Sequence, residues 1–243
     1  MRCLLTSICL FVMAAHVCAQ ESVTKLRITH LRGDFYIYET FSEYNGNRTP
    51  ASGMYLVTKA GVVLFDSPWD TTQFQPLLDS IQQRHHSPVT MCFATHFHSD
   101  RTAGLEYYRK LGIKTLTTIH TDELSQTRGM KRAEFLLKKD SVFTVGSYSF
   151  ETFYPGPGHA PDNIVVWFPQ QKILYGGCLV KSTEDEDLGN LGDADVKKYA
   201  YSIQNVIRHC PNPAYVIPGH GDWTDKRSLQ HTLKMARRIE RKG

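Results

Sequence analysis

The chain has 243 residues, of which 41% are hydrophobic and 21% are charged. This composition is typical of a globular protein and excludes a disordered or fibrous chain. Twenty-eight basic residues stand against 24 acidic ones, a formal net charge of only +4, and no basic stripe is interleaved with aromatic residues, so we expect no nucleic-acid partner.

The first 19 residues have the features of a secretory signal peptide. Arg2 gives a positive start, residues 3–15 form an apolar run, and Val17 and Ala19 make a small-residue cleavage site before Gln20. The run is too short to span a membrane, and no later segment approaches about 18 apolar residues. We therefore predict export to a bacterial periplasm, removal of residues 1–19, and a mature protein without a stable membrane anchor.

Cleavage would leave three of the six cysteines, namely Cys92, Cys178 and Cys210. Three widely spaced cysteines do not make a disulfide framework. Because an unpaired thiol is a liability in an oxidising compartment, at least one of them needs another reason to be present, and metal ligation is a good one.

In the first half of the mature chain, alternating and continuous apolar runs predict strands. These strands cover residues 35–38, 54–58, 62–65, 89–94 and 113–118, with a hairpin turn at 59–61. Helical spacing occurs at Leu77 and Ile81 and again across 105–111, and we expect residues 122–138 to be mostly helical. Residues 41–50 are expected to form a turn-rich loop between strands.

The second half repeats this order of elements. Its predicted strands cover residues 142–145, 148–154, 164–168, 172–175 and 214–217, and its predicted helices lie around 196–207 and 229–236. Strands followed by helices, twice over, predict an α+β fold with two similar halves packed sheet to sheet and with helices outside. No linker divides the chain, so we expect residues 20–243 to form a single domain.

The segment His96-Phe97-His98-Ser99-Asp100 places three ligand-capable side chains at positions i, i+2 and i+4. In an extended chain these positions share one side. The segment directly follows a predicted buried strand, which puts it at a sheet edge. Taken alone, the motif is equally compatible with a pair of solvated loop histidines.

Three further candidates, His159, Cys178 and His220, also follow predicted strands, and each lies beside one or more glycines. Glycine lets the backbone approach a ligand closely. Imidazole, carboxylate and thiolate are all good zinc ligands, and six of them exceed the need of one tetrahedral ion. The pattern therefore predicts two zinc ions, roughly 3.5–4 Å apart. Two divalent ions outweigh the negative charges of Asp100 and Cys178, so we expect the site to favour anionic substrates.

The run from Thr95 to Asp100, the later Gly158-His159 and the final Pro218-Gly219-His220 resemble the motifs of the metallo-β-lactamase superfamily. This resemblance covers nearly the whole mature chain and implies a four-layer αβ/βα sandwich. The superfamily also contains thioesterases, lactonases and nucleases, so the fold alone does not decide the function.

Other residues resemble the first subclass of the class B, zinc-dependent β-lactamases. Arg101 follows Asp100 where the thioesterases and nucleases usually have histidine, Cys178 replaces their bridging aspartate, and Lys181 comes three residues later. Residues 158–163 and 188–190 also resemble that subclass. The resemblance implies hydrolysis of β-lactam antibiotics by a metal-bound hydroxide, and hence antibiotic resistance.

The resemblance also implies roles for single residues. His96, His98 and His159 would hold the first zinc ion, and Asp100, Cys178 and His220 would hold the second. Asp100, Lys181 and Asn190 would act in the reaction. Lys181 would bind the substrate carboxylate, and Asn190 would donate a hydrogen bond to the carbonyl oxygen. Asp66 and Arg101 would support the metal ligands from behind.

Simpler interpretations stay open for several of these residues. Lys181 could be a solvated lysine, Asn190 a turn residue, and Asp66 the cap of a turn. Arg101 could be no more than a solvated residue at the start of a helix. In the family a loop such as residues 41–50 flaps over the substrate, but here it could be an ordinary mobile hairpin.

Two rival functions remain at this point: another hydrolase on the same site, such as a thioesterase or lactonase, and a zinc-binding protein without catalysis. We expect a monomer whose partner is a small β-lactam molecule.

Overall fold

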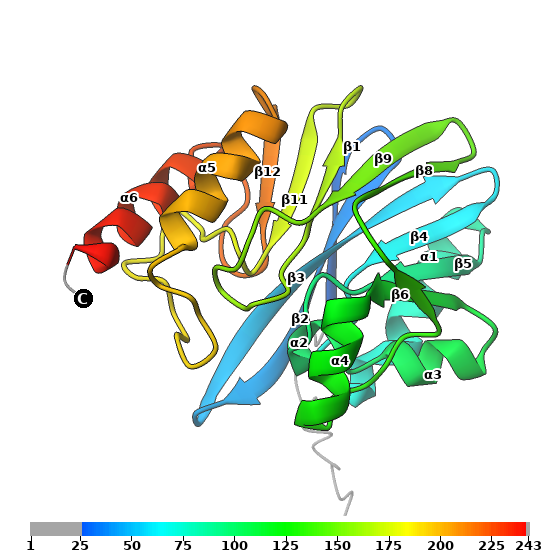
Figure 1. The fold of residues 1–243 in the computed structure, drawn as a ribbon. Helices are drawn as coiled ribbons and strands as arrows, with labels where there is room; N and C mark the ends of the chain where they lie inside the picture. The colour runs from blue at the N-terminus through cyan, green and yellow to red at the C-terminus, as the bar shows by residue number, and fades with distance from the viewer. Residues whose placement is uncertain (1–25, 242–243) are drawn as a thin grey trace, which may run out of the picture.

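The computed structural model describes residues 26–241, so the predicted signal peptide lies outside the described residues. Within this range the chain folds into two β-sheets with helices on their outer faces (Figure 1). None of the helices in residues 26–241 combines the length and apolar character needed to cross a membrane. Cys92, Cys178 and Cys210 are free and buried, in keeping with the expectation that they form no disulfide framework.

The first sheet is built by the N-terminal half, in the strand order β1-β2-β3-β4-β5-β6-β7. Its strands are β1 (Leu26–Arg32), β2 (Phe35–Tyr44), β3 (Asn47–Thr58), β4 (Gly61–Phe65), β5 (Val89–Phe93), β6 (Lys114–Thr118) and β7 (Phe135–Leu137). The pairs from β1 to β4 are antiparallel, and those from β4 to β7 are parallel.

The second sheet is built by the C-terminal half, in the order β12-β11-β10-β9-β8. Its strands are β8 (Ser141–Val145), β9 (Tyr148–Phe153), β10 (Val165–Phe168), β11 (Ile173–Gly177) and β12 (Tyr215–Pro218). Only the β11–β12 pair is parallel among these.

The helices divide between the halves. The first half carries the 3₁₀ turn η1 (Thr71–Gln73), α1 (Phe74–His85), α2 (Ser99–Thr102), α3 (Leu105–Lys110) and α4 (Ile119–Arg128). The second half carries α5 (Tyr199–His209) and α6 (Ser228–Glu240), which lie side by side against the second sheet (Figure 1).

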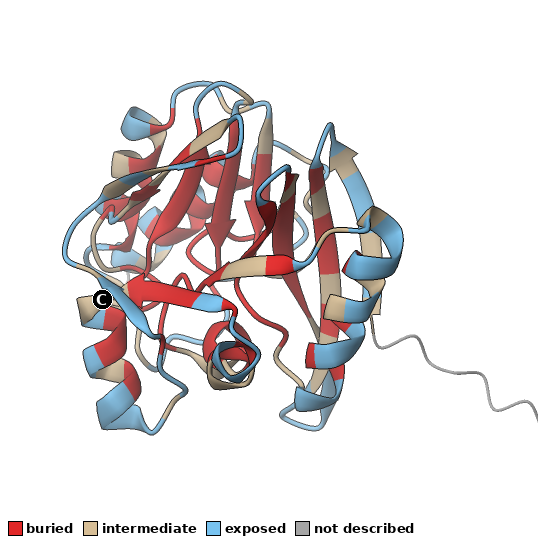
Figure 2. Cartoon of the chain, turned by 90° about the vertical axis from the view of Figure 1, so that its right-hand side faces the viewer, coloured by how far each residue is buried: buried red, intermediate tan, exposed pale blue. Residues whose placement is uncertain are grey.

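The fold has four layers, helices–sheet–sheet–helices, and an apolar cluster lies between each pair of neighbouring layers. One fills the space between the sheets, one joins the first sheet to α1 and α3, and one joins the second sheet to α5 and α6. Alternate residues of a single strand serve different clusters: Val63 and Phe65 face the other sheet, whereas Leu64 faces the helices. This is the αβ/βα sandwich of two similar halves that the sequence led us to expect, and its central strands, such as β4, β10 and β11, are buried on both faces (Figure 2).

The segment 41–50, expected to be a loop, is instead the end of a hairpin. The β2–β3 ladder continues until Tyr44 pairs with Asn47, and Asn45 and Gly46 form the two-residue turn. Both turn residues have positive φ, 50° and 75°, which matches the twist of the flanking strands. The turn residues therefore occupy only two positions, and the strands run right up to them.

The expectation of a mostly helical stretch over 122–138 was also wrong. Helix α4 ends at Arg128 because Gly129 takes a left-handed conformation, φ 68°, and caps it. Residues Phe135–Leu137 then form β7, which pairs in parallel with β6.

The ends of the strands position the chemistry. Asp66 directly follows β4, the histidine segment follows β5, Cys178 directly follows β11, and His220 comes two residues after β12. His159 lies in the loop between β9 and β10. Polar side chains from four strand ends and one loop thus gather along one edge of the sandwich.

Candidate metal centre

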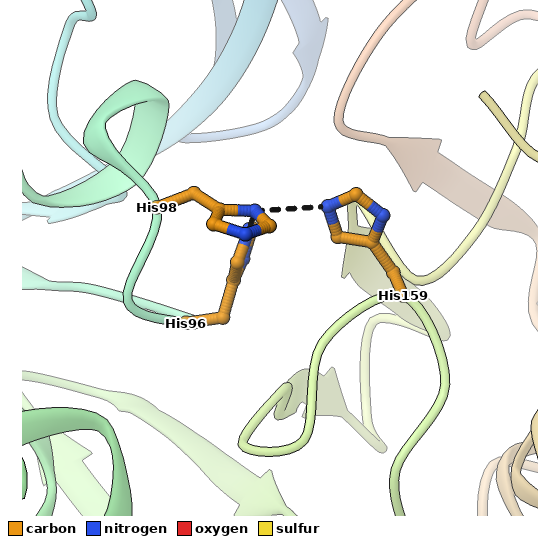
Figure 3. A group of neighbouring side chains, drawn as sticks. All are labelled: His96, His98 and His159. Carbon is orange, nitrogen blue, oxygen red and sulfur yellow. Dashed lines mark hydrogen bonds between the residues drawn. The ribbon is translucent and has the colours of Figure 1, made fainter. Parts of the chain in front are cut away.

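The first group of candidate ligands consists of three imidazoles, drawn in Figure 3. His96 Nε2 lies 3.0 Å from His98 Nδ1, and His98 Nδ1 lies 3.2 Å from His159 Nε2. His96 and His98 come from the segment after β5, whereas His159 reaches the group from the other half of the molecule. The three nitrogens lie within 4.8 Å of one another, a spacing that suits a shared metal ion.

The second group consists of a carboxylate, a thiol and an imidazole. Asp100 Oδ2 lies 3.3 Å from Cys178 Sγ and 3.1 Å from His220 Nε2, and Cys178 Sγ lies 3.4 Å from His220 Nε2. His96 also offers a ligand atom within 4.8 Å of Asp100 and Cys178, so the two groups adjoin. The structure therefore brings together all six side chains that the sequence singled out.

The spacing and chemistry of these atoms fit zinc. Bonds of about 2.0–2.3 Å in tetrahedral geometry would separate ligand atoms by roughly 3.3–3.7 Å, close to the distances observed here. The donor set of imidazole, carboxylate and thiol is the set that zinc prefers. In addition, His98 Nδ1 faces two ring nitrogens at once, an arrangement that a single proton cannot satisfy but a cation can.

Burial keeps two of the imidazoles in the state that binds metal. The pKa values of His96 and His159 fall well below the usual range because burial disfavours the charged ring. Both rings are therefore neutral at neutral pH, as a metal ligand must be. Burial raises the pKa of the Cys178 thiol, so a cation is needed to hold it as a thiolate.

Asp100 is held in its ionised form. Burial alone would raise its pKa, but Arg101 and His220 outweigh that effect and hold the pKa well below its usual range. Arg101 Nη2 lies 2.9 Å from Asp100 Oδ2, and both side chains are almost fully buried. The guanidinium therefore supplies the partner that a buried carboxylate requires.

Arg101 and Asp66 form a buried polar network beneath the ligands. Arg101 donates to the carbonyl oxygens of Ser52 and Gly219 at 2.7 and 2.9 Å. Asp66 accepts from the backbone N–H of Thr95 at 2.7 Å and from the Tyr175 hydroxyl at 2.7 Å. Burial raises the pKa of Asp66 to about 6, although Arg101 opposes the rise, so the carboxyl is ionised at neutral pH.

This network answers two of the open interpretations from the sequence. Arg101 is 1% exposed and does not solvate a helix start, and Asp66 is fully buried rather than capping a surface turn. Asp66 has φ 67°, a left-handed conformation that a non-glycine residue adopts at some cost. Its carboxylate holds Thr95, the residue before His96, and thereby fixes the start of the ligand segment.

Gly219 shows why a glycine precedes the last candidate ligand. A Cβ at this position would lie 2.7 Å from Cys178 Sγ and 2.8 Å from Arg101 Nη2. Any larger residue would displace a candidate ligand or its buried support, so the close approach of the backbone requires glycine here.

A cavity of about 370 Å³ opens above the two groups. Its walls include Trp69, Met130, Lys181 and Asn190, and four of the six candidate ligands line it, namely His98, Asp100, His159 and His220. Lys181 is only 8% exposed, and its backbone N–H donates to Thr232 Oγ1 on α6 at 2.9 Å. Asn190 is exposed, and its Oδ1 accepts from Gly192 N at 2.9 Å. Asn190 thus lines the cavity and also closes a turn.

Sequence reasoning missed Asp193, which contacts a candidate ligand directly. Its Oδ2 lies 3.1 Å from His98 Nε2, and its Oδ1 accepts from Arg128 Nη2 at 2.9 Å. Its place three residues after Asn190 was the available signal, but only the fold shows that this loop reaches His98. Sequence reasoning also missed Trp69, which donates to Ser99 Oγ at 2.9 Å and lines the cavity.

The sequence of this chain is similar to those of known proteins over most of its length. The family profile described as "Metallo-beta-lactamase superfamily" matches residues 47–220. The chain is 40% identical to "Metallo-beta-lactamase type 2" of Elizabethkingia meningoseptica over 222 residues, 91% of this chain and 89% of that protein. It is 37% identical to the protein of the same name from Bacillus cereus over 220 residues, 90% and 86% of the two chains.

A solved structure extends the comparison to the fold. The structure of a metallo-β-lactamase from Pontibacter korlensis has a TM-score of 0.84 with this protein, at 35% sequence identity, covering 87% of this chain and 99% of that one. The matched family profile, the identity to curated relatives and the shared sandwich agree, and this chain belongs to the metallo-β-lactamase superfamily.

Proposed function

We propose that this protein is a zinc-dependent hydrolase that opens the β-lactam ring of antibiotics and so confers resistance. One observation carries the proposal: two adjoining triads of candidate ligands lie under a cavity of about 370 Å³ whose wall includes a buried lysine. The relatives named metallo-β-lactamase support the same substrate class for this chain.

In this proposal His96, His98 and His159 hold one zinc ion, and Asp100, Cys178 and His220 hold the other. Zinc ions bound there would supply a Lewis acid and lower the pKa of a water molecule to about 7. Hydrolysis adds water across the ring C–N bond: the water oxygen goes to the carbonyl carbon, which becomes a carboxyl group, and a proton goes to the former ring nitrogen, which becomes an amine.

The remaining roles fall to the side chains of the cavity wall. The Lys181 ammonium group binds the carboxylate that β-lactams carry, and α6 holds the lysine in place through Thr232. Asn190 faces the same cavity and donates to the lactam carbonyl oxygen. Asp66 and Arg101 keep the ligand segment and Asp100 in position from below.

The proposal extends to the cellular setting. We propose that residues 1–19 direct export to the periplasm, that residues 20–243 act as one domain, and that the enzyme works as a monomer without a membrane anchor. The bacterial relatives and the apolar run at residues 3–15 support export.

Steady-state kinetics on matched substrate panels test the function. The zinc-loaded protein should hydrolyse penicillins, cephalosporins or carbapenems with kcat/KM of at least about 10⁴ M⁻¹s⁻¹, the lower end of ordinary enzymes. A panel of thioesters and lactones should give values far below that. Turnover of thioesters or lactones alone would assign the site to a different hydrolase of the superfamily, and a loaded protein inert to all three panels would mean zinc binding without catalysis.

A further inference from the structure

The β2–β3 hairpin forms one wall of the cavity. Tyr44 and Thr49 of the hairpin line it together with Trp69. The Tyr44 ring packs against the Trp69 ring with centroids 5.5 Å apart, and Trp69 lies beside His220 with ring centroids 6.4 Å apart. The height of the hairpin therefore decides how closely this wall approaches the candidate ligands.

A buried glutamine holds the hairpin at its base. Gln73, at the end of η1, is 1% exposed. Its Nε2 donates to the Phe41 carbonyl oxygen at 2.6 Å, and its Oε1 accepts from the Phe41 N–H at 2.9 Å. One carboxamide thus satisfies both polar backbone groups of a single strand residue, as a neighbouring strand would.

The position of this contact follows from the strand pairing. In the described residues β1 begins at Leu26, which pairs with Thr40, so Phe41 lies one residue beyond that pairing. On the other side Phe41 pairs with Pro50, which has no N–H to donate. The polar groups of Phe41 therefore face the edge of β2 that β1 leaves unpaired within residues 26–241, and the Gln73 side chain contacts them there.

The opposite edge of the hairpin base is tied to the candidate metal centre. His220 Nδ1 lies 2.6 Å from the carbonyl oxygen of Pro50, and Ser52 N donates to the carbonyl oxygen of Gly219 at 2.8 Å. The pair Phe41–Pro50 is thus held on both edges, by Gln73 and by His220. Beyond this pair, Ser42 and Thr49 are half-buried and residues 43–48 are exposed.

We propose that Gln73 is a positioning residue that fixes the base of the hairpin at Phe41, beside the cavity. The clamp sets the height of Tyr44 and Thr49 above the cavity and thereby the affinity for substrate. This last step depends on the proposed function, whereas the clamp itself is a property of the folded chain.

Two substitutions test the clamp, with a matched control. Gln73→Glu keeps the shape but turns a second oxygen toward the Phe41 carbonyl, and Gln73→Met keeps the length without any polar atom. Gln83→Glu makes the same chemical change on an exposed position of α1. Amide hydrogen exchange of residues 41–49 is measured for each folded protein, with circular dichroism as the check of folding.

Both Gln73 variants should exchange about 10- to 100-fold faster in residues 41–49, because Gln73→Met loses both hydrogen bonds at the hairpin base and Gln73→Glu replaces the bond to the Phe41 carbonyl with repulsion between two oxygens. The control should match the wild type. With a β-lactam substrate, KM should rise about tenfold in the Gln73 variants while kcat changes less than about twofold, since substrate binding and not the reaction step is weakened.

If hydrogen exchange is unchanged in either folded Gln73 variant, Gln73 does not fix the hairpin base. If exchange is faster but KM is unchanged, the position of the hairpin does not affect substrate affinity. Should both variants fail to fold, the wild type still decides: the Phe41 amide should exchange at least about tenfold more slowly than the Glu43 amide, two residues along the strand and beyond the clamp. Equal rates overturn the proposal. A wild type that hydrolyses no β-lactam contradicts the proposed function, and the exchange data then still decide the clamp.

Discussion

His98 and His220 each use one ring nitrogen to face the candidate ligands and the other to bind the protein. His98 Nε2 contacts Asp193, and His220 Nδ1 contacts the carbonyl oxygen of Pro50. A carbonyl oxygen can only accept, so we assign the His220 proton to Nδ1, which leaves Nε2 free to bind a cation. The contacts behind the ligands thus select the form of each ring that can hold a metal.

Cys178→Ser should weaken binding of the second zinc ion by at least about 100-fold, since serine lacks the thiolate that completes the group with Asp100 and His220. The zinc affinities are measured by competition with a chromophoric chelator. Cys210→Ser, a change of the same kind in a buried cysteine of the apolar cluster under α5, serves as the control. Two zinc ions held as tightly in Cys178→Ser as in the wild type would remove Cys178 from the ligand set.

Lys181→Ala should raise KM for β-lactams by about 10- to 100-fold with a smaller effect on kcat, because a charge-assisted contact to the substrate carboxylate is lost in both ground and transition states. Lys181→Arg should recover part of the loss because it restores the charge. The kinetics are compared for substrates with and without the carboxylate. An unchanged KM for every carboxylate-bearing substrate would return Lys181 to the status of a structural lysine.

At the scale of elements, the loop that carries Asn190 is fastened to the other half of the molecule. Asp193 in this loop bridges His98, which follows β5, and Arg128 at the end of α4. Arg128 also lies over the Phe97 ring at 5.9 Å. One carboxylate therefore couples the position of the loop to the orientation of a candidate ligand.

Asp193→Asn should lower the affinity of the first zinc site by about tenfold, because a neutral amide supports the His98 ring less well than a carboxylate does. The second site should keep its affinity, which distinguishes this effect from general damage. Chelator competition on the cobalt-substituted protein reads both sites. Asp195→Asn removes a charge from the same loop without touching His98 and is the control; an equal loss in both variants would refute the coupling.

The elements that sequence reasoning predicted well are those fixed by local patterns. Continuous apolar runs located β4, β5 and β10, and the residues that follow strands were correctly expected to gather at a sheet edge. The hairpin end at Tyr44 was taken for a loop because polar residues there hide the alternation of a strand. Gln73 and Asp193 could not be found in this way, since their partners lie 32 and 95 residues away and only the fold brings them together.

At the scale of the whole molecule, three apolar clusters hold the four layers around the candidate metal centre. Cys210 lies in the cluster between the second sheet and its helices and is fully buried. Burial, with a smaller effect of Glu151, raises the pKa of its thiol from 9.0 to about 12. The folded protein thus keeps a proton that the unfolded chain loses above pH 9.

This difference makes stability depend on pH in a defined direction. The contribution of the Cys210 thiol to the free energy of unfolding is fully present below pH 9. It is lost as pH rises toward 12, because the unfolded chain then binds fewer protons than the folded one. Relative to Cys210→Ala, the wild type should lose about 2 kcal/mol of unfolding free energy between pH 8 and pH 10.5. Urea unfolding at both values measures it, and a constant difference between the two proteins would contradict the buried thiol.

The most direct test of zinc-dependent β-lactam hydrolysis is a zinc titration of the metal-free protein, with ring opening as the readout. We expect no hydrolysis without metal, and activity that rises with added zinc until two ions are bound per chain, as analysis of the bound metal would show. Full hydrolysis in the presence of a chelator, or saturation with zinc that produces no ring opening, would contradict zinc-dependent β-lactam hydrolysis by this protein.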